Sequence, residues 1–224
     1  MDMIKRFLAM TPVGWQEELK RHHFRRQIKK GSFVTDEPEY AQLDKLVGDG
    51  DWVIDIGANI GHYTTRLSEL VGATGRVIAF EPIPTTFGHL ATNVLSCRYH
   101  NITLINAAVS ETTAAMGMSI PNFSTGLKNY YQASISSQVS ETDTLVLTLS
   151  IDSLQLPQTI RLIKIDAEGH EPAVLKGISN ILQRDKPILI VETVTAEVLA
   201  QLQPLGYQAQ TYPGSPNTVF KVSA

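Results

Sequence analysis

Cysteine is almost absent from this 224-residue sequence, and Cys97 is the only one. A single thiol excludes an intramolecular disulfide and a zinc site built from several cysteines. Long apolar runs are also missing. The stretch from Phe7 to Met10 ends at Thr11-Pro12, which is too short for the core of a signal peptide, and no run reaches the roughly 18 apolar residues of a membrane helix. The sequence therefore predicts a soluble, cytoplasmic protein without a transmembrane segment.

A positive charge excess is lacking over most of the chain. The formal net charge is −3, but residues 1–30 contain eight Lys and Arg against three Asp and Glu, whereas residues 31–224 contain 11 against 19. Nucleic-acid-binding domains usually have a dominant basic face, so we do not expect nucleic acid as a partner. We predict a basic N-terminal arm over residues 1–30. The simplest interpretation is a solvated, irregular or helical segment, and contact with phosphate or an anionic membrane surface is the alternative.

The rest of the chain, residues 31–224, has the alternating pattern of one α/β domain. Apolar runs predict strands over residues 51–56, 76–80, 102–109, 160–165 and 187–191, and residues 145–149 are a further candidate strand. Helical spacing of apolar residues predicts helices over residues 36–47, 60–71, 84–95, 172–182 and 196–202. Such alternation implies a parallel sheet with both faces covered. Residues 207–211 and 218–222 flank a Pro-Gly-Ser-Pro turn, which predicts a closing antiparallel hairpin.

The turn after the first predicted strand has the sequence Asp55-Ile-Gly57-Ala-Asn59-Ile-Gly61, and Glu81 ends the second strand. Small residues there let a ligand approach the backbone, and the following helix offers free N–H groups. An NAD-binding turn needs glycine at its first, third and sixth positions, but only the first is glycine here. Asp55 suits a ligand ammonium group and Glu81 suits a ribose diol. Helix capping by Asp55 and a surface position for Glu81 are the alternatives.

Several stretches together resemble the FkbM family of S-adenosylmethionine-dependent methyltransferases. They are Asp55–Thr64, Val77–Pro82, Asn106–Ser110, Leu162–Glu171, Leu175–Gly177 and Ile190–Glu192, and the similarity covers about residues 35–195. The resemblance implies a Rossmann-like, doubly wound α/β fold whose mostly parallel, seven-stranded sheet ends in the C-terminal antiparallel hairpin. It also implies that S-adenosylmethionine is the cofactor and S-adenosylhomocysteine the product.

The resemblance assigns the cofactor site residue by residue. The residues implied are Asp55, Gly57, Asn59, Gly61, Glu81, Asn106 and Ala107. Asp55 would lie near the methionine amino group, and Glu81 would accept hydrogen bonds from the ribose. Asn106 and Ala107 would flank the adenine, with plain packing as the alternative for these two.

A second group of ionisable residues, Asp166-Ala-Glu168-Gly-His170-Glu171, follows the strand over residues 160–165. Ligands of open α/β sheets bind at this end of the strands, so we predict Asp166 and Glu168 as the catalytic residues that orient and help deprotonate a hydroxyl. Capping of the next helix is the alternative. His170 is expected to be solvated. We expect no metal, although Asp166, Glu168 and Glu192 could together hold a divalent ion.

Lys164 lies inside an otherwise apolar strand, where an unpaired ammonium group would be costly. We expect it to pair with a carboxylate, such as that of Glu192.

The predicted function is methyl transfer from S-adenosylmethionine to a hydroxyl of a small molecule, sugar, glycolipid or secondary metabolite. The acceptor is a small molecule or glycan whose identity the sequence does not give, and oligomeric state is not readable from it. N- or C-methylation and a non-catalytic S-adenosylmethionine-binding module are the alternatives. The polar segment 121–137, with Lys128, Tyr130, Tyr131 and Ser134, is expected to cover the acceptor pocket, unless it is an ordinary surface loop.

Overall fold

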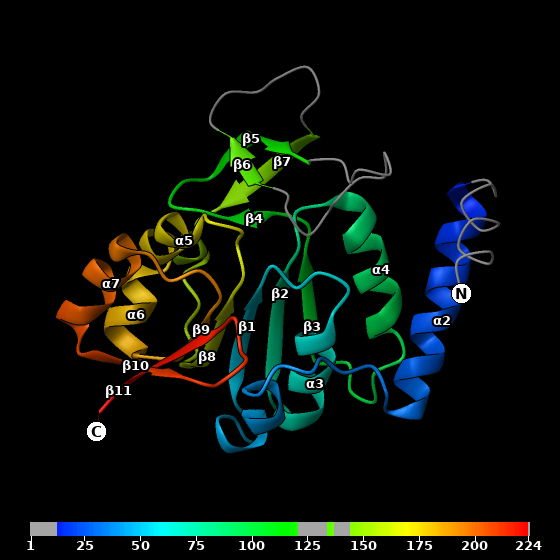
Figure 1. The fold of residues 1–224 in the computed structure, drawn as a ribbon, viewed down its shortest axis with the longest axis horizontal. Coiled ribbons are helices and arrows are strands. Elements are labelled where there is room, and N and C mark those ends of the chain that lie inside the picture. Colours follow the sequence, from blue (N-terminus) through cyan, green and yellow to red (C-terminus); the bar gives the residue numbers. More distant parts are fainter. Residues whose placement is uncertain (1–12, 121–133, 137–143, 224) are drawn as a thin grey trace.

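A seven-stranded sheet forms the centre of the protein (Figure 1), as seen in a computed structural model that describes residues 13–120, 134–136 and 144–223. Its strands are β1 (Trp52–Ile56), β2 (Arg76–Phe80), β3 (Ile102–Ile105), β8 (Ile160–Ile165), β9 (Ile188–Val191), β10 (Tyr207–Thr211) and β11 (Thr218–Val222). The order across the sheet is β10-β11-β9-β8-β1-β2-β3. Strand β11 is antiparallel to both β10 and β9, and the other neighbouring pairs are parallel. The predicted mostly parallel sheet with a C-terminal antiparallel hairpin is confirmed.

Helices cover both faces of this sheet because successive strand residues point to opposite sides. On one face, Ile54 and Ile56 of β1 belong to the core formed with α5 (Glu171–Gly177), α6 (Ser179–Asp185) and α7 (Ala196–Leu202). On the other face, Val53 packs in the core that contains α3 (His62–Val71). Asp55 therefore shares its face with Val53 and points toward α3.

Three predicted elements are shorter or divided in the structure. Instead of a helix over residues 36–47 there is one short 3-10 helix, η1 (Tyr40–Lys45). Its later start agrees with Pro38, because the residue before a proline, here Glu37, is disfavoured in helical conformation. The helix predicted over residues 172–182 divides into α5 and α6 at Ile178, whose φ of −124° is not helical.

The strand predicted over residues 102–109 also divides, into β3 and β4 (Ala108–Val109). The break lies at Asn106, whose side-chain amide donates hydrogen bonds to the carbonyls of Glu81 and Pro82. Strand β4 leaves the main sheet and joins β5 (Ala114–Ser119), β6 (Ser134–Ser136) and β7 (Thr144–Leu149) in a second sheet of order β4-β7-β5-β6. This sheet lies beyond the carboxyl ends of β2 and β3 (Figure 1). Of this sheet, the sequence predicted β4, as the end of the strand over residues 102–109, and β7, but neither β5 nor β6.

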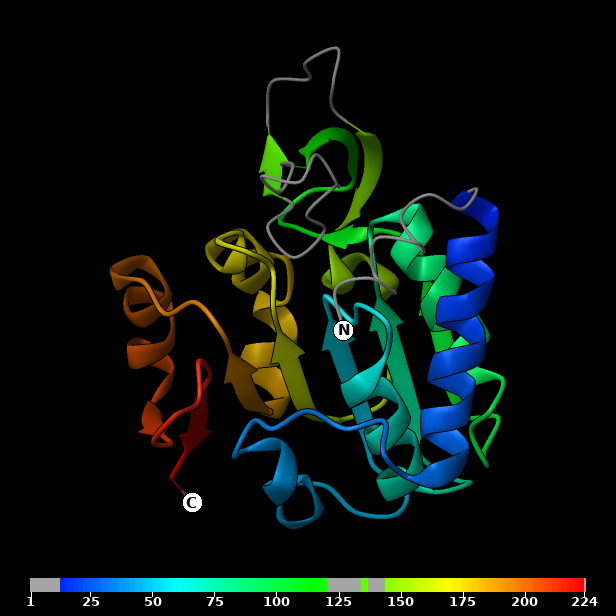
Figure 2. The same ribbon diagram turned by 45° about the vertical axis from the view of Figure 1, so that its right-hand side comes forward.

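The N-terminal segment forms a helix, α2 (Val13–Lys30), outside α4 (Pro84–Val94) (Figure 2). Glu17 pairs with His89 of α4, and the ring of Phe24 lies 5.8 Å from that of His89 and 5.9 Å from that of Phe33. No helix among residues 13–120 and 144–223 is long and apolar enough to cross a membrane. The division of the chain at residue 30 into an arm and a domain stays a prediction.

Candidate functional site

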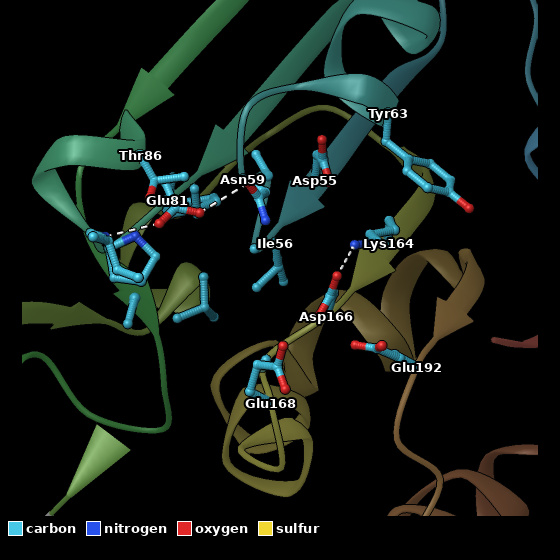
Figure 3. A pocket seen from close by; sticks show the side chains of 18 of the residues that line it. Asp55, Ile56, Asn59, Tyr63, Glu81, Thr86, Lys164, Asp166, Glu168 and Glu192 are labelled. Carbon is cyan, nitrogen blue, oxygen red and sulfur yellow. Dashed lines mark hydrogen bonds and ion pairs between the residues drawn. The ribbon is translucent and has the colours of Figure 1, made fainter. Parts of the chain in front are cut away.

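A cavity of about 520 Å³ lies at the carboxyl ends of β1, β2 and β8 (Figure 3). In this view Ile56 lies between Glu81 on one side and Asp166 on the other. Met118 and Ile135 of the second sheet also line the cavity. Small-molecule sites typically measure 300 to 1,000 Å³ and combine apolar walls with a few polar groups. The cavity is therefore large enough for a ligand of nucleotide size.

The glycine turn between β1 and α3 forms one wall. Gly57 has a φ of +74°, and a Cβ at this position would lie 1.9 Å from the carbonyl oxygen of Asp166. Gly61 has a φ of +98°, and its Cβ would lie 2.7 Å from a methyl of Leu90. Both glycines are thus required by the backbone conformation and by close packing. Asn59, with a φ of +50°, turns its backbone N–H into the site.

Glu81 receives that N–H. Its Oε2 accepts from the backbone nitrogen of Asn59 at 2.9 Å, and its Oε1 accepts from that of Ile83 at 2.9 Å. Burial raises the pKa of Glu81 to about 7, although the two N–H donors oppose this shift. Each carboxylate oxygen has a second lone pair. Glu81 can therefore still accept hydrogen bonds from a ligand in the cavity.

Asp55 is fully buried at the back of the site. Its Oδ2 accepts a hydrogen bond from Thr64 at 2.5 Å, whereas its Oδ1 has no hydrogen-bond partner within the described parts of the chain. Burial raises the pKa of Asp55, and the charge of Lys164 opposes this effect. A buried acceptor without a donor is costly, so Oδ1 is suited to a donor group that a ligand supplies.

Lys164 is the ionic centre of the site. Its side chain is 6% exposed, its Nζ lies 2.6 Å from Oδ2 of Asp166, and it also lies 5.2 Å from the ring centre of Tyr63. Burial alone would lower the pKa of Lys164, but Asp166 and Asp55 outweigh burial and raise it. Lys164 therefore remains charged. The expected carboxylate partner is present, but it is Asp166 and not Glu192.

The other side of the cavity is acidic, with Asp166, Glu168 and Glu192 gathered opposite Glu81 (Figure 3). The charge of Lys164 and a hydrogen bond with Glu192 hold the pKa of Asp166 below its usual range, against the effect of burial. The same hydrogen bond, followed by burial, raises the pKa of Glu192. Burial and the neighbouring Asp166 raise the pKa of Glu168. The three carboxyl groups thus differ in pKa: that of Asp166 is lowered, and those of Glu168 and Glu192 are raised.

These three carboxylates could also hold a metal ion. One oxygen from each lies within 4.8 Å of the others, and oxygen ligands suit magnesium. Lys164 already places one positive charge 2.6 Å from Asp166, which reduces the attraction of this group for a second cation. The expectation that the site works without a metal stays a prediction.

The turn that carries Glu168 is fixed by its neighbours. Glu168 has a φ of +50° and Gly169 a φ of +91°. The buried Glu171 accepts hydrogen bonds from the backbone nitrogens of Ala167 and Gly169, at 3.2 and 3.3 Å. Glu171 therefore stabilises this turn and the start of α5. His170, expected to be solvated, is instead half-buried and lies 2.9 Å from the hydroxyl of Ser110.

Most of the predicted site residues meet at this cavity. Those that line it are Asp55, Gly57, Asn59, Glu81, Ala107, Asp166 and Glu168. Gly61 and Asn106 are not among the lining residues, because Gly61 packs against Leu90 and the Asn106 side chain is directed to backbone carbonyls. In the predicted covering segment, Ile135 lines the cavity, whereas Lys128, Tyr130 and Tyr131 lie outside the described residues.

Sequence reasoning missed Glu37 and Tyr63, which also line the cavity. The hydroxyl of Tyr63 bonds to Glu37 and donates to Glu39 at 3.2 Å, and the amide of Asn217 donates to Glu37 at 3.2 Å. This network joins the segment before β1 to the C-terminal hairpin. Tyr63 stands in the Asp55–Thr64 motif and was available as a signal, whereas nothing in the sequence links Glu37 to the site.

Comparisons with known proteins agree with this geometry. The family described as "Methyltransferase FkbM domain" matches residues 55–209. "Hexuronic acid methyltransferase AglP" of Haloferax volcanii is 30% identical over 158 residues, which make up 69% of this chain and 58% of that protein. A crystal structure of "Methyltransferase FkbM" from Methylobacillus flagellatus has a TM-score of 0.52 at 20% identity, over 83% of this chain and 50% of that chain.

Aeropyrum pernix fibrillarin, solved with natively bound S-adenosyl-L-methionine, has a TM-score of 0.50 at 15% identity, over 79% of this chain and 68% of that chain. These structural likenesses establish a shared Rossmann-like fold. The chain spans only slightly more than half the length of AglP and half that of the Methylobacillus protein.

Proposed function

Since this chain belongs to the FkbM methyltransferase family, we propose that it transfers a methyl group from S-adenosylmethionine to a hydroxyl oxygen of a sugar, a glycolipid or another small molecule. The observation that carries the proposal is that one cavity joins Glu81 and the glycine turn to the acidic group of Asp166 and Glu168. The similarity to a hexuronic acid methyltransferase supports a sugar-like acceptor.

The residues present fit S-adenosylmethionine. Glu81 retains lone pairs for the two ribose hydroxyls, and the free Oδ1 of Asp55 suits the amino group of the methionine part. The apolar residues Ile83, Ala107 and Val109 line the cavity near Glu81 and suit the adenine ring. When bound, the cofactor supplies an electrophilic methyl group on its sulfonium.

The two proposed catalytic carboxylates have different roles. A hydroxyl that attacks the methyl group must lose its proton, and the best base has a pKa near the working pH. Glu168, exposed and with a raised pKa, takes this proton. Asp166, whose pKa is held low by Lys164 despite its burial, is a weaker base and orients the hydroxyl by accepting a hydrogen bond.

The test begins with calorimetry, in which S-adenosylmethionine should bind and NADH should not. Turnover is then measured with a panel of hydroxylated acceptors. Glu168→Gln should retain cofactor affinity and lose about 10² to 10⁴-fold in kcat, and Asp166→Asn should mainly raise the acceptor KM. Glu69→Gln makes the same chemical change at an exposed position of α3 and should behave as the wild type.

The outcomes separate the alternatives. Cofactor binding without turnover on any acceptor would favour a non-catalytic binding module, and methylated nitrogen or carbon in the product would overturn the hydroxyl acceptor. Wild-type turnover by both amide variants would place the base elsewhere. If EDTA abolished activity and magnesium restored it, the three carboxylates would be metal ligands instead.

A further inference from the structure

The outer face of α2 combines exposed apolar and basic residues. Trp15 is 70% exposed and Leu19 is 50% exposed. His22 and Arg26 continue the same stripe, since positions i, i+4, i+7 and i+11 lie on one side of a helix, and both are exposed. Exposed Lys29 and Lys30 end the helix. An exposed indole beside an exposed leucine, on a helix face that otherwise carries polar and basic residues, suggests a partner with an apolar layer.

The opposite face of α2 is already used by the fold. Phe24 packs on His89 and Phe33, and Glu17 pairs with His89. The two acids of the helix are also paired within it, Glu17 with Lys20 at 3.0 Å and Glu18 with Arg21 at 3.4 Å. The outer face thus keeps a fixed position on the domain. The exposed Glu18 lies beside Trp15 and Leu19 on this face and is paired with Arg21, and the other charges of the face are positive.

The charge distribution indicates the partner. Helix α2 has six Lys and Arg against two Asp and Glu, whereas residues 31–224 have 11 against 19. An anionic lipid surface attracts the helix and repels the rest of the domain, so the charges favour one orientation. Two copies joined through their α2 faces would bring like charges together.

We infer that the outer face of α2 binds the surface of an anionic lipid bilayer. Trp15 and Leu19 lie at the boundary of headgroups and acyl chains, where tryptophan is favoured, and Arg26, Lys29 and Lys30 lie over the anionic headgroups. The N-terminal end of α2, which carries Trp15, points to the same end of the molecule as the carboxyl ends of the parallel strands (Figures 1 and 2). Because Lys29 and Lys30 at the other end of α2 also contact the headgroups, the helix lies along the bilayer surface, with the cavity at the Trp15 end of the molecule.

The experiment is sedimentation of the full-length chain with vesicles of phosphatidylcholine alone or with 30% phosphatidylglycerol, the latter composition being about a third anionic lipid. Binding is expected only to the anionic vesicles and should weaken at high salt. Arg26→Glu with Lys30→Glu should reduce the affinity roughly tenfold or more, as should Trp15→Ala with Leu19→Ala. Lys45→Glu with Arg98→Glu makes the same charge change at exposed positions outside α2 and should leave binding intact.

Circular dichroism melts verify that each variant is folded, which is expected because all the altered side chains are exposed. The inference is overturned if the wild-type chain does not bind anionic vesicles at low salt, or if the α2 variants bind as well as the wild type. It is also overturned if the wild type is a dimer that Trp15→Ala with Leu19→Ala dissociates and that does not bind vesicles, because a second copy then covers this face.

Discussion

At the scale of single residues, burial changes the pKa of a carboxyl group, and burial is visible only in the structure. The sequence identifies Glu81 as a carboxylate at a strand end, but only the structure reveals its two backbone donors and its enclosure. Burial raises the pKa of Glu81 from 4.5 to about 7. Because this pKa is raised in the folded state, the free energy of unfolding of the unliganded protein should fall as the pH rises through that range.

Cofactor binding should depend on pH with the opposite sign. Ionised Glu81 accepts hydrogen bonds from both ribose hydroxyls, whereas its protonated form has less acceptor capacity. Affinity for S-adenosylmethionine, measured by calorimetry, should therefore rise about tenfold between pH 6 and pH 8. Glu81→Gln should bind more weakly and lose this dependence. An equal slope in Glu81→Gln would assign the titration to another group, with Asp55 and Glu192 the nearest candidates.

Lys164 marks the limit of residue-level prediction. The sequence indicates that this buried ammonium group needs a carboxylate, and residues two apart in a strand share a face, so Asp166 was an available choice. The register of the sheet was not available. The register pairs Lys164 with Asp55 across β1 and β8, and this puts one charge between the glycine turn and the acidic side of the cavity.

At the scale of elements, strands with long apolar runs were predicted well, because burial on both faces leaves a strong pattern. Strands β1, β2, β8 and β9 are of this kind. The second sheet was mostly missed because β5 is built from Ala, Gly, Ser and Met and contains none of the β-branched or aromatic residues that mark a strand. Its formation depends on pairing with β7, which is a tertiary contact.

The turn between β1 and α3 offers a direct test of packing. Gly57→Ala places a methyl group where the carbonyl of Asp166 now lies 1.9 Å away, at a φ of +74°. Gly31 has a similar φ of +67° and nothing within 4 Å. Denaturant unfolding should give a loss of roughly 1 to 2 kcal/mol for Gly31→Ala and about 4 kcal/mol or more for Gly57→Ala. Equal losses would mean that the turn relaxes and that its contact with β8 does not require glycine.

At the scale of the whole molecule, most of the basic residues near the N-terminus belong to a helix, α2, that packs on the outside of α4. Residues 13–30 of the basic segment form this helix (Figure 2). Charge counts alone left this segment as a solvated arm, because four of its residues, Glu17, Arg21, Phe24 and Ile28, turn inward and too few of them are apolar to predict a packed face. Whether residues 31–224 form an independent domain depends on what α2 contributes to stability.

We predict that residues 31–224 alone fold and bind S-adenosylmethionine but are less stable than the full chain. Removing α2 uncovers Phe33 and His89, which are 5% and 6% exposed, and exposing one such aromatic side chain costs about 1.5 to 3 kcal/mol. For a domain of this size the melting temperature should fall by roughly 4 to 10 °C. None of the residues that line the cavity belongs to α2, so saturating cofactor should raise the melting temperature of both proteins equally.

Phe24→Ala in the full chain is the matched milder change, because it removes the contacts with Phe33 and His89 and retains the helix. Its melting temperature should lie between those of the other two proteins. A short series of contacts joins α2 to the site: Phe24 packs on Phe33, and the ring of Phe33 stacks on that of His62 at 4.1 Å. His62 lines the cavity. If the shortened chain melted cooperatively but gained no stability from S-adenosylmethionine, this series of contacts would be essential, and α2 would be part of the cofactor-binding domain and not an appendage to it.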